Sequence, residues 1–193
     1  PTPEIDVKRT TAPAPTADAG PSIVVNTLRV SGSTLFAERD LIAAAQVAPG
    51  SRLTLGELQA AAARIAGFYN RRGYFLTQAY VPAQDIAGGV VTIAVIEGRY
   101  DAIEVHNTSR LSGNRPARVL EGLNTGDIVN IAPLERRLLL LGDTPGIRLK
   151  STLAPGGTAG TSNLIVDIAP GPAISGSVEA DNAGNRYTGV YRF

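Results

Sequence analysis

The feature that most constrains the fold of this chain is an internal repeat. Residues 50–58 and residues 126–134 share one order of turn, cap and apolar positions, so that Asn130 repeats Thr54 at a separation of 76 residues. Both residue types cap helices, because their side-chain oxygen accepts a hydrogen bond from a free backbone N–H group. The sequence therefore predicts two tandem copies of one small module.

Each copy is predicted to have the element order β-α-α-β-β. In the first copy, Thr54 and Glu57 fit a capping box, and the apolar residues behind it recur at the spacing of one helix face. The strands are short runs of β-branched or alternating residues between turn residues. The expected strands are residues 23–30, 75–81, 90–96, 102–106, 147–153 and 164–169, and the expected helices are residues 37–47, 55–72, 116–123 and 131–141.

These elements predict an α+β fold. We expect a first module at residues 22–98 and a second at residues 99–171, each with a three-stranded mixed sheet and two helices on one face. Residues 1–21 are rich in proline and poor in apolar side chains, which predicts an extended tether or a terminal tail. Residues 174–193 alternate between apolar and polar side chains, as a transmembrane β-strand or an ordinary edge strand does. Since the chain starts at Pro1 without a leader, we expect a mature protein or an excised fragment.

Composition excludes several classes of function. The 193 residues include no cysteine and one histidine, so zinc–thiolate sites, disulfides and thiol nucleophiles are excluded. The net charge of +1, without a long basic run, argues against nucleic-acid binding. We expect His106 on the surface at a strand end, no catalytic residue, no cofactor and no metal ion, and we predict that the chain is not an enzyme. Four carboxylates are expected to be solvated: Asp85, Glu97, Asp101 and Glu104.

An unpaired sheet edge is the feature best suited to binding. The free amides and carbonyls of an edge strand can pair with an extended peptide, which then adds to the sheet as another strand. The first strand of each predicted hairpin is our candidate edge. Alternatively, these strands are only structural and are guarded by Gln78, Arg148 and Lys150. The candidate binding residues are Phe75, Leu76, Thr77, Gln78, Ala79, Tyr80 and Val81 on the first edge, Ile65, Phe68 and Tyr69 in the groove beside it, and Ile147, Leu149 and Thr152 on a secondary edge.

Three sets of residues follow one another along the chain. The first set is Tyr69, Arg72-Gly73-Tyr74, Val81-Pro82, Gln84-Asp85, Gly89 and Val95-Ile96-Glu97-Gly98; the second is Leu153-Ala154-Pro155-Gly156 and Gly160-Thr161-Ser162-Asn163-Leu164; the third is Asp181-Asn182-Ala183-Gly184 and Thr188-Gly189. The first set resembles the first polypeptide-transport-associated (POTRA) domain of two-partner secretion outer-membrane transporters, the exporters of hemolysins and filamentous hemagglutinins. The second set resembles the second POTRA domain of this family, and the third resembles the opening of its transmembrane β-barrel. The three sets stand in the family's order.

The resemblance implies a function in protein secretion. The two POTRA domains of such a transporter capture an unfolded exoprotein by its N-terminal secretion domain, on the periplasmic side of the Gram-negative outer membrane, and pass it to the pore. It also implies that residues 172–193 are the truncated start of the barrel, whose remainder is missing. We expect binding by strand addition, a monomer, contact with the outer membrane through that missing barrel, and no nucleic-acid partner. The alternatives are a module of the barrel-assembly kind, which inserts outer-membrane proteins, and a structural scaffold of the envelope.

Overall fold

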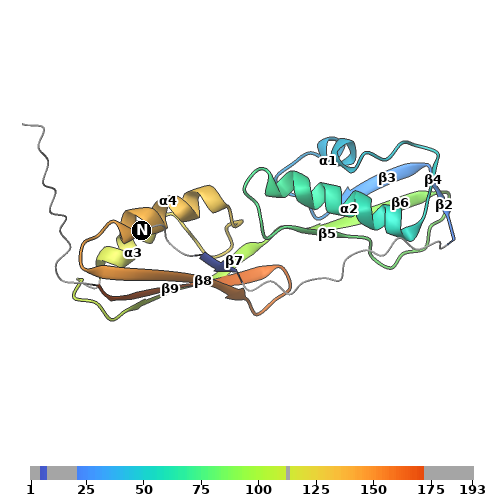
Figure 1. Cartoon of the computed structure of the whole chain (residues 1–193). Coiled ribbons are helices and arrows are strands. Elements are labelled where there is room, and N and C mark those ends of the chain that lie inside the picture. The colour runs from blue at the N-terminus through green and yellow to red at the C-terminus, as the bar shows by residue number, and fades with distance from the viewer. Residues whose placement is uncertain (1–4, 8–20, 112–113, 172–193) are drawn as a thin grey trace, which may run out of the picture.

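The computed structural model describes residues 5–7, 21–111 and 114–171. Two modules lie end to end, and the helices of both lie on the same side of the sheets (Figure 1). The first module contains β2 (Ile23–Val25), β3 (Thr27–Ser31), α1 (Glu38–Ala45), β4 (Ser51–Leu53), α2 (Leu55–Asn70), β5 (Gln78–Tyr80) and β6 (Val90–Ile96). The second module contains β7 (Arg99–Asn107), α3 (Asn114–Leu120), α4 (Ile131–Gly142), β8 (Ile147–Pro155) and β9 (Thr161–Pro170).

The first module has a three-stranded mixed sheet, as expected. Its strand order is β3-β6-β5, with β3 parallel to β6 and β5 antiparallel to it. The strand expected at residues 23–30 divides into β2 and β3, and β2 pairs with β4 outside this sheet. The division lies at Asn26, where the amides of Asn26 and Thr27 both donate to the carbonyl of Gly89.

Helix α2 supplies much of the first core. The predicted capping box is present, since the amide of Glu57 donates to Thr54 Oγ1 over 3.3 Å and the amide of Thr54 donates to Glu57 Oε2 over 2.7 Å. Leu55 opens the predicted apolar stripe, but it is 54% exposed and lies outside the core. The other named residues of the stripe are buried and pack against buried residues of β6. They are Leu58, Ala62, Ile65 and Tyr69 of α2 and Val91, Ile93 and Val95 of β6. Burial of each large apolar side chain contributes about 1.5–3 kcal/mol.

The second module repeats the first. Its strands β7, β9 and β8 correspond to β3, β6 and β5, because β7 is parallel to β9 and β8 is antiparallel to it. Asn130 caps α4 by accepting a hydrogen bond from the amide of Ala132 over 3.0 Å. Behind this cap, Leu134, Leu138 and Leu141 are buried in a separate second core. The repeat in the sequence thus corresponds to a repeat in the fold.

The second sheet also has a fourth strand that we did not predict. Residues Ile5–Val7 form β1, which pairs in parallel with residues Ser151–Leu153 of β8. The strand order is therefore β1-β8-β9-β7. The prediction that residues 1–21 are only a tether or tail was wrong for these three residues, whose apolar–acidic–apolar order suits a strand.

The predicted barrel start, residues 172–193, lies outside the described residues. Among the helices that are described, none combines the length and the apolar character that a membrane crossing needs.

We predict that Gly32→Ala strongly destabilises the first module. Gly32 has a φ of +83°, and a Cβ atom there would overlap the carbonyl oxygen of Val95. Gly50 is the matched control, because its φ is +77° but nothing lies within 4 Å of its Cβ position. Urea denaturation should show a loss of about 1 kcal/mol for Gly50→Ala and of at least about 3 kcal/mol for Gly32→Ala. Equal losses would contradict the steric explanation.

Candidate functional site

The open edge of the first sheet is β5, which is shorter than expected. This strand spans Gln78–Tyr80 and, among the described residues, pairs only with β6. Gln78 and Tyr80 are exposed, whereas Ala79 packs against the first core. One side of the β5 backbone is thus available for pairing.

The other residues of the predicted first edge lie in different surroundings. Phe75 and Leu76 pack against the core of the second module. The hydroxyl of Thr77 is buried without a hydrogen-bond partner in the described chain, and Val81 packs against the first core. The prediction of a longer edge strand was wrong because the segment before β5 forms part of the junction between the modules, where Leu76 lies against Gly98.

The predicted groove beside β5 is not lined by the residues that we assigned to it. Ile65 and Tyr69 are fully buried in the first core, so they offer no surface to a ligand. Phe68 is half-buried, and the guanidinium carbon of Arg72 lies 3.5 Å from the centroid of its ring. This cation–π contact covers one face of the ring. The surface available at this edge is therefore that of β5 itself.

Side chains cover two other positions at the edges of this sheet. Beyond the end of β5, Gln84 Oε1 accepts from the amide of Thr92, and Gln84 Nε2 donates to the carbonyl of Thr92, both over 2.8 Å. The side-chain amide thus takes the place of a backbone peptide beside β6. On the opposite edge, Glu38 Oε1 accepts from the amide of Val30 over 3.0 Å. A guest strand on β3 would have to displace this carboxylate, so β5 is the more accessible edge.

The secondary edge on β8 is already paired in part. Strand β1 lies beside Ser151, Thr152 and Leu153. Ile147 and Leu149, the other two residues assigned to this edge, pack against the second core. The prediction that Thr152 lies on a free edge was wrong, because the chain's own N-terminal segment occupies that position.

A buried carboxylate organises the end of β6. The side chain of Glu97 is only 2% exposed. Its Oε1 atom accepts from the amides of Thr34 and Leu35, over 2.9 and 3.0 Å, and from the hydroxyl of Tyr69, over 2.9 Å. The hydroxyl of Thr34 donates to the second oxygen. The prediction that Glu97 is solvated was wrong, because these protein donors replace the water that its carboxylate loses.

The protonation state of Glu97 follows from these contacts. Burial acts to raise its pKa, but the hydrogen bonds from Thr34, Leu35 and Tyr69 outweigh burial and hold the pKa below its ordinary value of 4.5. Burial, assisted by the bond to Glu97, raises the pKa of Tyr69 to about 12. At neutral pH the carboxylate is therefore charged and the phenol keeps the proton that it donates.

The same carboxylate connects the two modules through Arg99, the first residue of β7. Arg99 Nη2 lies 3.7 Å from Glu97 Oε2 and donates to Thr34 Oγ1 over 3.2 Å. Arg99 Nη1 donates to the carbonyl of Gly126 over 2.9 Å. One guanidinium thus contacts both modules, and it fixes their junction at the point where β6 passes into β7.

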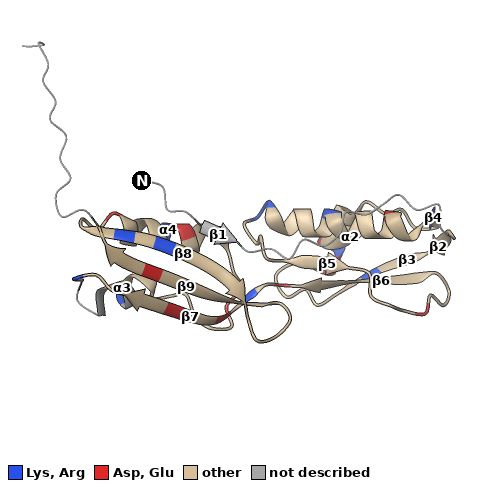
Figure 2. Ribbon diagram, turned by 60° about the horizontal axis from the view of Figure 1, so that its bottom comes forward, with Lys and Arg blue, Asp and Glu red and all other residues tan. Residues whose placement is uncertain are grey.

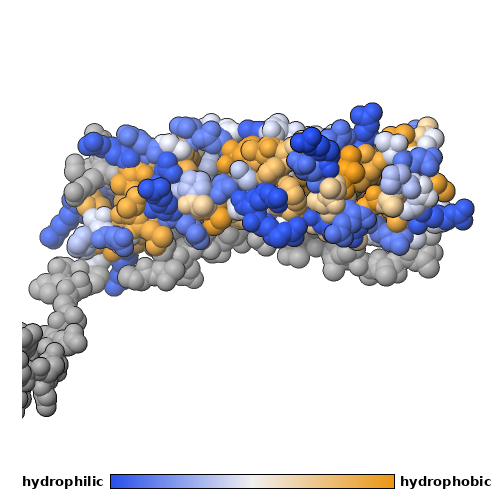
Figure 3. Space-filling model, turned by 90° about the horizontal axis from the view of Figure 1, so that it is seen from above, coloured by the Kyte–Doolittle hydropathy of each residue, from blue (hydrophilic) through white to orange (hydrophobic). Residues whose placement is uncertain are grey.

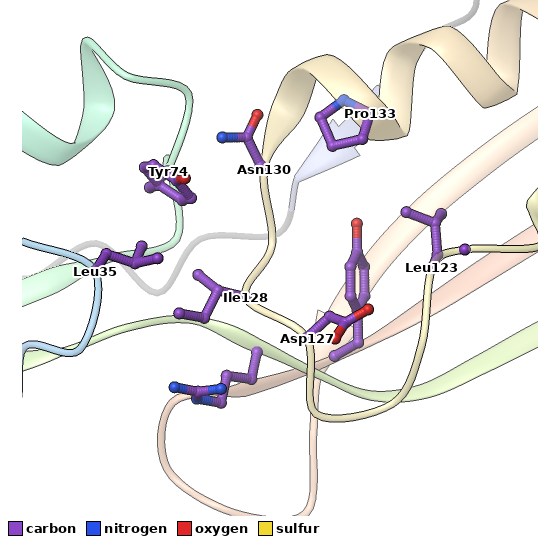
Figure 4. A pocket seen from close by; sticks show the side chains of 10 residues that line it. Leu35, Tyr74, Leu123, Asp127, Ile128, Asn130 and Pro133 are labelled. Carbon is purple, nitrogen blue, oxygen red and sulfur yellow. The ribbon is translucent and has the colours of Figure 1, made fainter.

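A cavity of about 550 Å³ lies at this junction. Leu35 and Tyr74 of the first module face Ile128 and Asn130 of the second across it (Figure 4). Tyr100 also lines the cavity, and its hydroxyl is buried without a hydrogen-bond partner in the described chain. Burial raises the pKa of Tyr100 to about 12. The wall thus combines apolar side chains and a neutral phenol with the charged side chains of Arg99 and Asp127.

An apolar patch lies on the helix side of the second module. Leu139 and Leu140 of α4 are exposed, and Leu140 lines a cavity of about 380 Å³ together with Leu111 and Val119. Apolar side chains gather between hydrophilic ones on the helix side of both modules (Figure 3). This patch belongs to the helical layer and is separate from the strand edges.

The charged side chains of the second sheet, and its histidine, lie on the surface. Basic residues lie on β8, and acidic residues lie on β9 and β7 (Figure 2). His106 Nδ1 lies 3.1 Å from Asp167 Oδ1, and His106 Nε2 lies 3.7 Å from Glu104 Oε2. The predicted surface location of His106 is confirmed. Within residues 5–7, 21–111 and 114–171, no group of three or more His, Cys, Asp or Glu side chains could hold a metal ion.

Comparison with known proteins identifies the first module. A sequence profile of the POTRA domain, ShlB-type, matches residues 23–98. The first module is thus similar to POTRA domains of the ShlB type. The chain is 33% identical over 144 residues to the heme/hemopexin transporter protein HuxB of Haemophilus influenzae, which covers 74% of this chain and 26% of HuxB. It is 30% identical over 186 residues to the outer membrane transporter CdiB of Escherichia coli O6:K15:H31, which covers 94% of this chain and 31% of CdiB.

Solved structures agree with this assignment. CdiB from Escherichia coli matches with a TM-score of 0.74 and 27% identity, over 94% of this chain and 34% of that chain. The N-terminal domain of Omp85 from Thermosynechococcus elongatus matches with a TM-score of 0.62 and 25% identity, over 78% of this chain and 67% of that chain. The resemblance to two-partner secretion transporters is confirmed, and POTRA domains of such outer-membrane transporters lie in the periplasm. The chain spans about a quarter to a third of the length of the curated relatives it matches.

We predict that Glu97 makes the stability of the POTRA domain depend on pH. Because its pKa is lowered in the folded state, its contribution to the free energy of unfolding is complete above the unfolded value of 4.5 and is lost as the pH falls through the lower folded pKa. Urea denaturation between about pH 7 and about pH 3 should therefore show a smaller loss of stability in Glu97→Gln than in wild type. Glu121→Gln changes an exposed carboxylate and should keep the wild-type pH dependence. The same pH dependence in Glu97→Gln and wild type would exclude this role.

Proposed function

We propose that this chain is the periplasmic region of a two-partner secretion transporter, and that residues 22–98 and 99–171 are two POTRA domains that receive an unfolded exoprotein. The exoprotein adds a strand to a sheet edge and then passes to the outer-membrane pore. The observation that carries this proposal is β5, an edge strand that is paired on one side only in the described chain.

The size of this edge suits a transient contact. Strand β5 has three residues, so a guest strand forms only a few backbone hydrogen bonds with it. Each such bond contributes about 0.5–1.5 kcal/mol net, and the entropy lost when the unfolded guest becomes ordered offsets part of the total. Binding is therefore weak and reversible, as it must be for a chain in transit.

Side chains on the outer face add selectivity to the backbone pairing. Tyr80 is 46% exposed, and Gln78 lies two residues away on the same face. A guest strand with β-branched or aromatic residues at alternate positions contacts these side chains, and such cross-strand pairs contribute about 0.2–1 kcal/mol each.

The partner is, in our proposal, a secreted exoprotein recognised by its N-terminal secretion domain. The relatives HuxB and CdiB are named as a heme/hemopexin transporter and an outer membrane transporter. The described modules act here as a monomer, and residues 172–193 lead into a barrel in the outer membrane. The secretion domain that binds identifies the exoprotein as an adhesin, a hemolysin, a toxin or a haem-acquisition protein.

A module of the barrel-assembly kind is the second candidate function. The N-terminal domain of Omp85 shares the fold of this chain, with a TM-score of 0.62. The two functions differ in the client, which is an exoprotein in the first case and an outer-membrane protein in the second. A parallel titration with an unfolded secretion domain and an unfolded outer-membrane barrel protein separates them, since each function predicts tighter binding of its own client.

We predict that proline substitutions in β5 separate binding from folding. The amides of Gln78 and Ala79 point to opposite sides of the strand, so one points to β6 and the other to the free edge. Gln78→Pro and Ala79→Pro each remove one of these donors. The variant that loses only the donor on the free edge should keep the wild-type melting temperature. It should bind the unfolded secretion domain about tenfold more weakly, measured by isothermal titration.

The matched control for this experiment is Gln78→Ala, which keeps both backbone amides. It should retain the wild-type affinity within about threefold, because pairing through the backbone is unchanged. Undiminished affinity in the folded proline variant would exclude β5 as the binding edge.

A further inference from the structure

The second sheet contains a strand acceptor that the chain itself fills. Strand β1 pairs with residues Ser151–Leu153 of β8, whereas β5, the equivalent strand of the first module, has a free side in the described chain. In Figure 1, β1 is the dark blue arrow. We propose that this part of β8 is a second strand-addition site, and that β1 is an exchangeable occupant which a strand of the exoprotein replaces. The proposal rests on the proposed function, since it applies the same binding mode to a different edge.

The contact between β1 and β8 is small enough to exchange. Strand β1 has three residues, whereas β8 and β9 pair over the whole of Ile147–Pro155. The sheet therefore keeps its longer ladder when β1 leaves. With net contributions of about 0.5–1.5 kcal/mol per hydrogen bond, an added strand of equal length can replace β1 at little cost in free energy.

The chain connection makes β1 a local competitor. Residues 8–22 join β1 to β2 along the sequence. A segment attached through a short connection is present at an effective concentration of the order of millimolar. A guest strand therefore binds β8 only if it pairs better than β1 or is itself held nearby. The site is selective because a free peptide always competes with β1 for it.

The register defines which side chains the guest strand needs. Ser151 and Leu153 are buried, and Thr152 between them is half-buried on the other face. In a parallel pair, residues in register lie on the same face of the sheet. A guest therefore places its residues opposite Ser151 and Leu153 on the buried face and its residue opposite Thr152 on the outer face. The sequence of β1 has the order apolar, acidic, apolar at these three positions.

The charge of the outer face agrees with that order. Arg148 and Lys150 are exposed on β8, and Lys150 lies two residues before Thr152 on the same face (Figure 2). An acidic guest residue opposite Thr152 lies near this ammonium group and is attracted to it. The partner that fits is therefore an extended segment, parallel to β8, in which apolar and acidic residues alternate.

The first experiment tests exchange without any exoprotein. The probe is a peptide of residues 1–10 of this chain, titrated into the ¹⁵N-labelled full chain while the amide of Leu153 is followed by NMR. In Asp6→Pro, which weakens the pairing of β1, we expect the Leu153 amide to shift and the peptide to return it toward its wild-type position. Wild type should require at least about tenfold more peptide, because its own β1 competes.

The control variant is Ala17→Pro, which adds a proline outside the three paired residues of β1 and should titrate like wild type. A scrambled peptide of the same composition should leave the Leu153 amide unchanged. Two results would overturn the proposal. One is an Asp6→Pro chain in which the peptide has no effect on Leu153, and the other is an Asp6→Pro chain whose second module melts well below wild type, which would make β1 a permanent part of the sheet.

The second experiment tests whether the exoprotein uses the same place. The chain has no cysteine, so Asp6→Cys with Thr152→Cys introduces one pair of thiols at positions in register. Neighbouring strands lie about 4.8 Å apart, which a disulfide can span. Oxidation holds β1 on β8, and reduction releases it. We expect the oxidised chain to bind the unfolded secretion domain at least about threefold more weakly than the reduced chain.

The outcomes distinguish this inference from the proposed function. Equal affinity in the oxidised and reduced states, with binding still weakened by proline in β5, overturns the role of β8 and leaves the role of β5 intact. Weakened binding in the oxidised state, with no effect of proline in β5, supports the role of β8 and overturns that of β5. The single variant Thr152→Cys, treated in the same way, should show no dependence on oxidation.

Discussion

The pairing of backbone groups at sheet edges is the constraint on which the rest of this structure depends. Each sheet has two edges, and the amides and carbonyls along them need partners from protein or water. Gln84 supplies a side-chain amide beside β6, Glu38 covers an amide of β3, and β1 lies on part of β8. In the described chain, β5 keeps one side unpaired, and so does β7 at the far edge of the second sheet. The groups that cover the other edge positions thus limit the places where an added strand could pair.

The junction between the modules sets the length of that open edge. Glu97 is held in a buried position by donors from the loop after β3 and from α2, and Arg99 extends the contact into the second module. Phe75 and Leu76 pack at this junction, so their backbone is not available to continue β5. The short edge is therefore a consequence of how the modules meet rather than of low β propensity. A short edge strand and a fixed junction thus arise from the same packing.

The sequence predicted those features whose causes are local. The capping box at Thr54 and the cap at Asn130 depend on residues two or three positions away, and the helix periodicity lies within one element. The burial of Glu97 could not be predicted in this way, because its donors come from Thr34 and Tyr69, which are distant in sequence. Strand β1 was not predicted for the same reason. Three residues carry little pattern of their own, and their partner strand lies near the other end of the described chain.

The different occupancy of two equivalent strands implies an order of events in the proposed function. In the described chain, a free exoprotein segment meets no competing strand at β5, whereas at β8 it competes with β1 at an effective concentration of the order of millimolar. Once one segment is paired with β5, the next segment of the same exoprotein is tethered as well, and its own effective concentration offsets that of β1. Exchange at β8 then follows capture at β5 without any change in the fold of either module. Because β8 pairs with β9, which leads directly to residue 171, the second contact also brings the exoprotein to the part of the chain that enters the barrel in the proposed transporter.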